Sequence, residues 1–318
     1  MTDTAAGPTG TLLAPVRDDA ADGSAAAPVD APVDAPVDAL AELVGRGGVM
    51  VLSGAGLSTE SGIPDYRGPT GALRTHAPMT YQTFTKDPVA RRRYWARSHL
   101  GWRTIAEARP NAGHRAVGAL QGLGVLAGVV TQNVDGLHQA GGARDVLELH
   151  GALSRVLCLD CGDRSDRADL DARLRDANPG FDAEVTRVNP DGDADLADEQ
   201  LDGFRTVPCL ACGDGTLKPD VVYFGETVPR ERVDASYALT DRCRLLLVLG
   251  SSLTVMSGRR FVLHARKRGT PVAIVNQGPT RGDEHADLKV AQPLGRVLPA
   301  LAARLGAAPG GAPGAVGS

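Results

Sequence analysis

Four of the five cysteines form two Cys-x-x-Cys pairs, the first at Cys158 and Cys161 and the second at Cys209 and Cys212. In a reducing compartment such pairs are metal ligands more often than disulfides. Two pairs supply the four thiolates of a tetrahedral zinc site and leave no coordination position open, which is typical of a structural metal. The sequence therefore predicts one structural zinc ion per chain, with a redox role for the cysteines as the alternative.

The segment between the two pairs, from about residue 163 to residue 202, is rich in Asp, Pro and Gly. This composition offers few large apolar groups to bury, so we expect an exposed acidic insertion in the zinc module. The fifth cysteine, Cys243, lies beside the apolar run at 245–249 and is expected to be a small core residue.

A glycine-rich loop, SGAGLS at residues 53–58, follows the apolar run VMVL and precedes a predicted helix. Glycines at such a turn let backbone N–H groups approach a pyrophosphate at a helix N-terminus. The dehydrogenase fingerprint needs a third glycine, where this chain has Thr59, and a later acidic residue for which no clear candidate follows. By itself the loop is explained about equally well as a structural turn.

Four short apolar runs end in small or polar residues, and helix-length segments separate them. The runs lie at 49–52, 125–130, 245–249 and 271–275, and the residues that follow them are Ser53, Thr131, Gly250 and Asn276. Such runs predict an α/β fold, a Rossmann-like parallel sheet with helices on both faces. Ligands of open α/β sheets bind outside the carboxyl ends of the strands, so the four endings should line one crevice.

Six segments, in order, then resemble the sirtuin family, closest to the class II sirtuins. They are GAGLSTESGIPDYR at 54–67, PNAGH at 110–114, TQNVD at 131–135, ELHG at 148–151, KPDVVYFGE at 218–226 and GSSL at 250–253. The resemblance spans roughly residues 40–305. Six ordered motifs leave little room for coincidence.

The resemblance implies an NAD-dependent protein-lysine deacetylase or deacylase that consumes NAD and releases nicotinamide and O-acyl-ADP-ribose. A lone histidine is more often structural, but the motif around His150 implies the general base that activates a ribose hydroxyl. Imidazole suits this role because its unperturbed pKa is ~6.5. A protein mono-ADP-ribosyltransferase using the same site is the alternative.

The resemblance also implies which residues meet NAD. Asn133 and Asp135 would receive the nicotinamide carboxamide, and Gln132 would bond the neighbouring ribose. The full set expected to bind NAD is Gly54, Ala55, Gly56, Ser58, Ile63, Asp65, Tyr66, Arg67, Gln132, Asn133, Asp135, Gly250, Ser251, Ser252, Asn276, Gln277, Gly278 and Leu294. Asp135 as a helix cap and Asn276 as a chain turn are the structural alternatives for two of them.

The partner implied by the resemblance is an acylated lysine side chain of another protein. Val221 and Val222 would pair with the extended substrate peptide by strand addition, and Phe224 would line the tunnel for the lysine stem. Sirtuins that remove acidic acyl groups place a Tyr and an Arg three residues apart on the helix expected at 88–108. Tyr94 and Arg97 have that spacing, but alignment without gaps displaces them by one residue, or about 100° around a helix. We therefore expect acetyl or longer neutral acyl groups.

Composition limits the other possibilities. The 318 residues carry a formal net charge of -4, which gives no electrostatic reason to expect nucleic acid or an anionic membrane as a partner. A binding module that grips nucleic acid through zinc knuckles is disfavoured for the same reason. No apolar run approaches the roughly 20 residues that span a bilayer. The N-terminus lacks the pattern of a secretory signal, so we expect a cytoplasmic protein.

The domain organisation follows from these patterns. Residues 1–38 are rich in Ala, Pro and Asp, and proline at every fourth position predicts a disordered tail. Residues 39–305 form the predicted catalytic domain, and residues 306–318 a flexible tail. Within the domain we expect a Rossmann-like part at 39–66, 110–156 and 216–305, a helical cofactor-loop part at 67–109 and a zinc module at 157–215.

Overall fold

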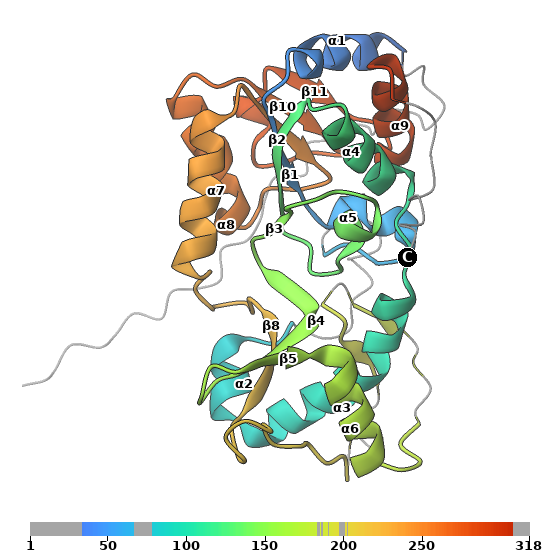
Figure 1. The fold of residues 1–318 in the computed structure, drawn as a ribbon, viewed down its shortest axis with the longest axis vertical. Coiled ribbons are helices and arrows are strands. Elements are labelled where there is room, and N and C mark those ends of the chain that lie inside the picture. The colour runs from blue at the N-terminus through green and yellow to red at the C-terminus, as the bar shows by residue number, and fades with distance from the viewer. Residues whose placement is uncertain are drawn as a thin grey trace, which may run out of the picture.

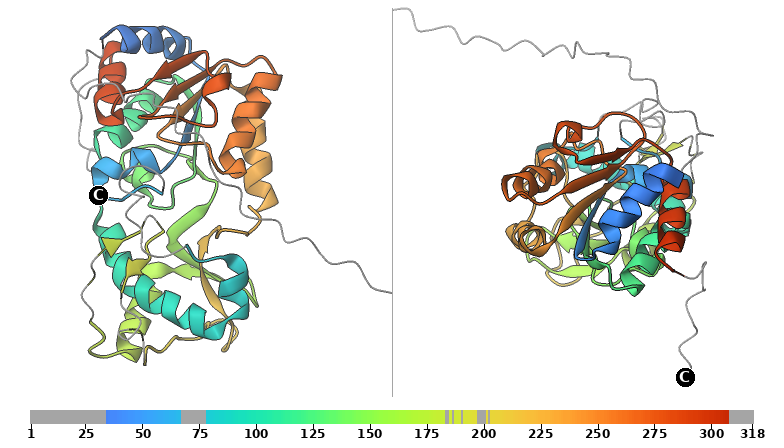
Figure 2. Two further views of the ribbon diagram at one scale, coloured as in Figure 1. Left: turned by 180° about the vertical axis from the view of Figure 1, so that it is seen from behind. Right: turned by 90° about the horizontal axis from the view of Figure 1, so that it is seen from above.

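The computed structural model describes residues 34–66, 78–182, 185, 187–189, 191–196, 201 and 203–307. These residues form two domains, one above the other in Figure 1, which Figure 2 shows from behind and from above. The upper, larger one, here called the sheet domain, comprises residues 34–66, 109–149 and 228–307. The lower one, here called the small domain, comprises the described residues of 78–108 and 150–227.

The sheet domain contains a six-stranded sheet in which every pairing is parallel. Its strand order is β11-β10-β9-β1-β2-β3. The strands are β1 (Val49–Ser53), β2 (Leu126–Thr131), β3 (Leu147–Glu148), β9 (Leu245–Leu249), β10 (Val272–Val275) and β11 (Leu288–Val290). The predicted α/β class and all four predicted strands are confirmed.

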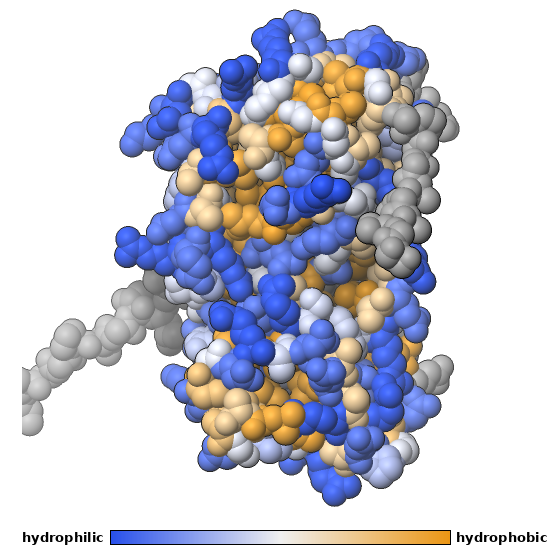
Figure 3. Space-filling view, in the orientation of Figure 1, coloured by the Kyte–Doolittle hydropathy of each residue, from blue (hydrophilic) through white to orange (hydrophobic). Residues whose placement is uncertain are grey.

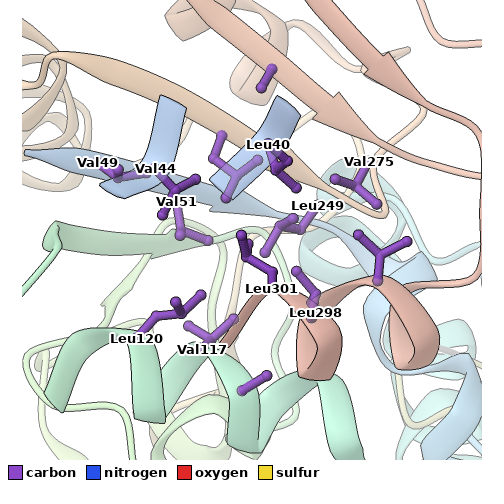
Figure 4. Close-up of a cluster of buried hydrophobic side chains, with 14 of the residues drawn as sticks. Leu40, Val44, Val49, Val51, Val117, Leu120, Leu249, Val275, Leu298 and Leu301 are labelled. Carbon is purple, nitrogen blue, oxygen red and sulfur yellow. The ribbon is translucent and has the colours of Figure 1, made fainter. Parts of the chain in front are cut away.

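Helices cover both faces of this sheet, as the view from above shows (Figure 2). On one face lie α1 (Asp34–Gly45), α4 (Ala112–Gly122) and α9 (Leu294–Arg304), and on the other α7 (Arg230–Arg242) and α8 (Met256–Lys267). Side chains alternate along each strand, so Val49 and Val51 pack toward the first group while Met50 and Leu52 pack toward the second. Figure 4 shows the first core, where Leu40, Val117, Leu298 and their neighbours meet.

Two local predictions in this domain were wrong. The predicted disordered tail extends to residue 38, but helix α1 already begins at Asp34. Pro36 lies in its first turn, where a missing N–H breaks no intrahelical bond, and Val37 is buried against the sheet. The glycine loop itself contains one 3-10 turn, Ala55–Leu57, and is followed by a second, Thr59–Ser61, in place of a regular helix. Gly62 ends the second turn with a φ of 84°, which a glycine adopts without strain.

The small domain is built on an antiparallel sheet in the order β5-β4-β8, formed by Arg164–Asp166, Gly151–Cys158 and Leu217–Val221. Helices α2 (Tyr81–Lys86), α3 (Pro88–Glu107) and α6 (Arg167–Ala177) pack around it, and a short hairpin pairs β6 (Arg187–Val188) with β7 (Ala194–Asp195). Helix α3 confirms the helix expected at 88–108. Asp87 caps it by accepting hydrogen bonds from the backbone N–H groups of Val89 and Ala90.

Part of the predicted exposed insertion, among the residues that the structure describes, instead contributes to the core of the small domain. Leu170 and Leu174 of α6 are buried beside apolar residues of α3. The guanidinium of Arg167, 1% exposed, lies over the rings of Trp95 and Trp102 at 5.3 and 5.4 Å. The acidic composition concealed this packing, because the apolar positions of α6 are few but fall on one face.

Figure 3 shows hydrophilic residues over most of one face, with smaller apolar areas between them. Within the described part of the chain, no helix combines the length and the apolarity needed to cross a membrane.

Candidate active site and metal site

A cavity of about 840 Å³ opens at the carboxyl ends of the parallel strands, where the two domains meet. Residues following β1, β2, β9 and β10 all line it, as expected because ligands of open α/β sheets bind outside the carboxyl ends of the strands. Of the residues expected to meet NAD or the peptide, those that line it are Gly54, Ala55, Gly56, Ser58, Ile63, Asp65, Tyr66, Gln132, Asn133, Asp135, His150, Val221, Val222, Phe224, Gly250, Ser251, Ser252, Asn276, Gln277 and Gly278. Arg67 lies outside the described residues.

Leu294 is the one described candidate that does not line the cavity. It begins α9 and is 7% exposed, with its side chain in the core behind the sheet. An added Cβ at Gly250 would lie 2.9 Å from Leu294 Cδ1, so the leucine supports the strand ending from behind.

One group of polar side chains links the glycine loop to the end of β2. The Ser58 hydroxyl donates to Asp135 Oδ2 at 2.7 Å, and Asn133 Nδ2 donates to Ser58 Oγ at 3.0 Å and to the Gly54 carbonyl at 3.1 Å. Asp135 Oδ1 also accepts from the Leu137 N–H at 2.9 Å, at the start of α5 (Leu137–Ala140). The capping alternative for Asp135 is therefore present together with its place in the cavity. This network fixes amide and carboxylate groups whose donors and acceptors suit a carboxamide ligand.

His150 lies between two hydrogen-bonding partners at the junction of the domains. Its Nδ1 is 2.9 Å from the Gln132 carbonyl oxygen, and its Nε2 is 2.8 Å from Ser257 Oγ. A carbonyl only accepts, so Nδ1 carries the proton and Nε2 keeps the lone pair. His150 is thus arranged as a base whose accepting nitrogen is at the cavity.

The electrostatic surroundings keep this imidazole neutral. Burial lowers the pKa of His150 to about 4; the hydrogen bond to the Gln132 carbonyl opposes this, and the charges of Arg232 and Arg260 add to it. Burial and the two arginine charges both disfavour the imidazolium form. At neutral pH the ring is therefore in the state that can accept a proton.

Two further histidines lie beneath the site and line no part of the cavity. His138 Nε2 is 2.7 Å from Ser53 Oγ, whose hydroxyl donates to Thr131 Oγ1 at 2.9 Å, and Thr131 in turn accepts from the backbone N–H of Asn133. His114 caps α4 together with Asn111, and its ring meets that of His138 edge to face at 5.3 Å. Burial lowers the pKa of both histidines to about 4. This buried series of hydrogen bonds supports the loop that carries Asn133.

The four predicted zinc ligands lie together in the small domain. The Sγ atoms of Cys158, Cys161, Cys209 and Cys212 are all within 4.8 Å of one another, and two of the separations are 3.8 Å. Zn–S bonds of ~2.3 Å in a tetrahedron place sulfur atoms about 3.8 Å apart, so the cluster has the dimensions of a Cys₄ zinc site. An added Cβ at Gly215 would lie 2.3 Å from Cys158 Sγ, so only glycine leaves room at the cluster. Cys243 is buried elsewhere, with its thiol donating to the Thr240 carbonyl.

A family model described as the Sir2 family matches residues 54–257, the span from the glycine loop to the first turn of α8. The chain belongs to the Sir2 family. It is 60% identical, over 84% of its own length and 89% of the relative's, to "NAD-dependent protein deacetylase 1" of Streptomyces coelicolor. These similarities confirm the predicted sirtuin, an NAD-dependent protein deacetylase whose four-cysteine cluster fits structural zinc.

Solved structures agree with this Sir2 fold. One described as "Structural Basis for the Mechanism and Regulation of Sir2 Enzymes" has a TM-score of 0.67 at 30% identity, covering 85% of this chain and 98% of that one. Another, "Sir2 bound to acetylated peptide", has a TM-score of 0.67 at 25% identity, covering 86% and 99%.

Several residues that line the cavity of this Sir2 enzyme were missed in the sequence, among them Ser257 and Asp191. Ser257 comes from the first turn of α8, and Asp191 comes from the turn between β6 and β7, within the insertion expected to be exposed. Serine in a helix and aspartate in a polar loop are too common for their residue type or spacing to identify them as cavity residues. Conversely, Tyr94 and Arg97 do not line the cavity: Tyr94 is 0% exposed and Arg97 pairs with Asp193 at 2.9 Å.

Proposed function

We propose that this Sir2 enzyme moves acyl groups from protein lysines to the ADP-ribose part of NAD, releasing nicotinamide and O-acyl-ADP-ribose. The observation that carries the proposal is the state of His150. Its imidazole is neutral at physiological pH, and its proton-accepting Nε2 faces a cavity lined by four strand endings. A base in that position takes the proton of a ribose hydroxyl, so that the hydroxyl oxygen attacks the activated acyl carbon.

In this proposal the strand endings and the glycine loop together hold the different parts of NAD. Ser58, Asn133 and Asp135 receive the nicotinamide carboxamide, because their mutual hydrogen bonds hold them in one fixed arrangement. Gln132 meets the adjoining ribose; its side chain already donates to Ser251 Oγ at 3.0 Å and so links two strand endings. Ile63 is proposed to join the nicotinamide pocket, and Tyr66 to screen the face of the reactive ribose. The remaining ligands proposed toward the phosphates and the adenosine are Gly54, Ala55, Gly56, Asp65, Gly250, Ser251, Ser252, Asn276, Gln277 and Gly278, with Arg67 and the backbone at Leu294 as expectations from the sequence.

The substrate peptide is proposed to lie along Val221 and Val222, with the lysine stem beside Phe224. All three line the cavity, and β8 pairs with β4 along one edge only, among the residues the structure describes. An edge strand presents unpaired backbone groups that an extended peptide can bond. The ring of Phe224 is 40% exposed and lies 6.0 Å, edge to face, from that of Tyr66, which forms an aromatic wall for an aliphatic stem.

Neutral acyl groups are the proposed substrates, with acetyl the smallest. The cation that could pair with an acidic acyl group, Arg97, is already held by Asp193 through two contacts of its Nε, at 2.9 and 3.2 Å. The same hairpin brings Asp191 to the cavity, where a carboxylate disfavours an acyl group of like charge. Met79 and Val228 supply apolar lining suited to a hydrocarbon chain. The motif pattern further supports a class II assignment within the family.

Mass spectrometry of the products formed from NAD and a panel of acetyl-, butyryl- and succinyl-lysine peptides tests the proposal. We expect O-acyl-ADP-ribose from the neutral peptides and a loss of about 10²–10⁴ in rate for His150→Ala. His264→Ala is the matched control, because His264 lies on α8 outside the cavity and should leave the rate unchanged. Turnover of succinyl-lysine alone would overturn the acyl preference. Transfer of ADP-ribose to protein without deacylation would overturn the reaction itself.

A further inference from the structure

The hydroxyl of Ser257 contacts the ring of His150 directly, and the proposed deacylation mechanism assigns it no role. It lies in the first turn of α8, lines the cavity and has its Oγ 2.8 Å from Nε2 of His150. Because Nδ1 donates to the Gln132 carbonyl, Nε2 can only accept, and the Ser257 hydroxyl must be the donor. The proton-accepting atom of the base is thus already occupied by a hydroxyl of the protein.

This arrangement has two effects on the imidazole. The hydrogen bonds at Nδ1 and at Nε2 hold both ring nitrogens, so they restrict rotation of the imidazole about its side-chain bonds. Nε2 therefore stays directed at the cavity. The bond from Ser257 stabilises the neutral ring and is lost when Nε2 is protonated, which lowers the basicity of His150. A ribose hydroxyl is chemically the same kind of donor as the serine hydroxyl, so it can replace Ser257 at Nε2 without changing the tautomer.

We propose that Ser257 is a positioning residue for the deacylation reaction: it holds Nε2 of His150 toward the cavity until the ribose hydroxyl of NAD takes its place. The inference rests on the proposed role of His150. When the ribose hydroxyl binds, the Ser257 hydroxyl turns to another acceptor, and the proton then passes from the ribose oxygen to Nε2. No other group is needed for the proton balance of this step.

Other charges around His150 set the background for any change at Ser257. Arg232 of α7 and Arg260 of α8 both oppose protonation of the ring, and Arg232 is itself paired with Asp220 of β8 at 3.0 Å. Further carboxylates line the cavity, namely Asp65, Asp135, Asp191 and Glu226. Replacing Ser257 leaves all of these in place, so the difference between the wild-type protein and the variant isolates the hydroxyl.

The test is NMR of the free, zinc-loaded protein with labelled histidine, in which His150→Asn identifies the resonances of His150. In the wild type we expect the Nδ1–H tautomer. In Ser257→Ala we expect the pKa of His150 to rise by about 0.4 to 1, the shift that corresponds to one lost neutral hydrogen bond. Ser257→Thr keeps the hydroxyl and should restore the wild-type value. Ser252 also has its hydroxyl in this cavity, but that hydroxyl bonds Thr254. Ser252→Ala should therefore leave the pKa of His150 unchanged.

An Nε2–H tautomer in the wild type, or an unchanged or lower pKa of His150 in Ser257→Ala, would overturn the inference. In turnover, the acidic limb of the pH profile of kcat/KM should move to higher pH in Ser257→Ala by the same amount. The NMR readout needs no NAD and no acyl peptide. It therefore separates failure of this inference from failure of the proposed reaction, which the peptide panel tests.

Discussion

The two histidines beneath the active site should make the stability of this enzyme fall steeply in mild acid. His114 and His138 are 0% and 1% exposed, and burial lowers the pKa of each from 6.5 to about 4. In the unfolded chain both take up protons near pH 6.5, whereas the folded protein keeps them neutral. Their stabilising contribution is therefore complete above pH 6.5 and is lost as the pH falls from 6.5 toward 4.

The size of the effect follows from the two pKa values. At pH 5 each histidine lowers the free energy of unfolding by about 2 kcal/mol relative to pH 8, so the pair lowers it by about 4 kcal/mol. For this pair the slope between pH 5 and 6 should be about 2.3 kcal/mol per pH unit. The pKa values of the Asp171, Asp241 and Asp283 carboxyls are lowered from 3.8, so these groups change the free energy of unfolding mainly below pH 3.8, outside this window. The ring of His150, whose pKa burial likewise lowers to about 4, adds to the loss of stability in the same pH range.

Urea unfolding followed by circular dichroism between pH 5 and 7.5 measures this slope, with zinc release monitored in parallel by a chromogenic chelator. His138→Gln removes one protonation site of this pair and should reduce the slope by about 1.2 kcal/mol per pH unit. A free energy of unfolding that is flat over this range while zinc stays bound would refute the reasoning. So would a His138→Gln variant that keeps the full slope.

Three other changes have defined outcomes. A strong chelator should unfold the small domain and abolish deacetylation, as seen by circular dichroism and zinc quantification; full activity in verified metal-free protein would defeat the zinc assignment. Gly215→Ala places a Cβ against Cys158 Sγ and should weaken zinc binding at least tenfold in a chelator competition, whereas Gly122→Ala, with open space around it, should not. Gly101→Ala brings a Cβ within 2.5 Å of the Gly192 carbonyl, between α3 and the β6–β7 hairpin. It should lower stability by about 1–3 kcal/mol in urea unfolding, and wild-type stability would contradict the close packing.

Much of the fold could be predicted because its signals are local. The strand at 245–249, for example, is a run of consecutive large apolar residues buried on both faces, so its hydropathy alone indicates its place. The cysteine pairs carry their geometry in their spacing, and the structure brings Cys158 and Cys212 within 3.8 Å. The rule that ligands lie at the carboxyl ends of parallel strands then places the site without further information.

The features that were missed have two kinds of cause: a contact between distant segments, and local composition that was misleading. The bond between His150 and Ser257 joins residues 107 positions apart, and nothing around Ser257 in the sequence marks it. Helix α6 was hidden because its charged composition outweighs its two buried leucines, Leu170 and Leu174. The start of α1 was misjudged because its prolines were weighed as helix breakers, although Pro36 occupies a position in the first turn where proline is tolerated.

The strand order also determines when the protein can fold during synthesis. Strand β1 lies between β2 and β9, yet its last residue, Ser53, precedes the start of β9, at Leu245, by almost the whole catalytic chain. At roughly 5–20 residues per second, a ribosome needs on the order of 10–40 seconds to travel from one to the other. Throughout that time one edge of an apolar strand has no partner, and the small domain, which ends at residue 227, is completed only near the end of the interval. Nascent chains of this enzyme should therefore depend on chaperones until the last third of the polypeptide emerges.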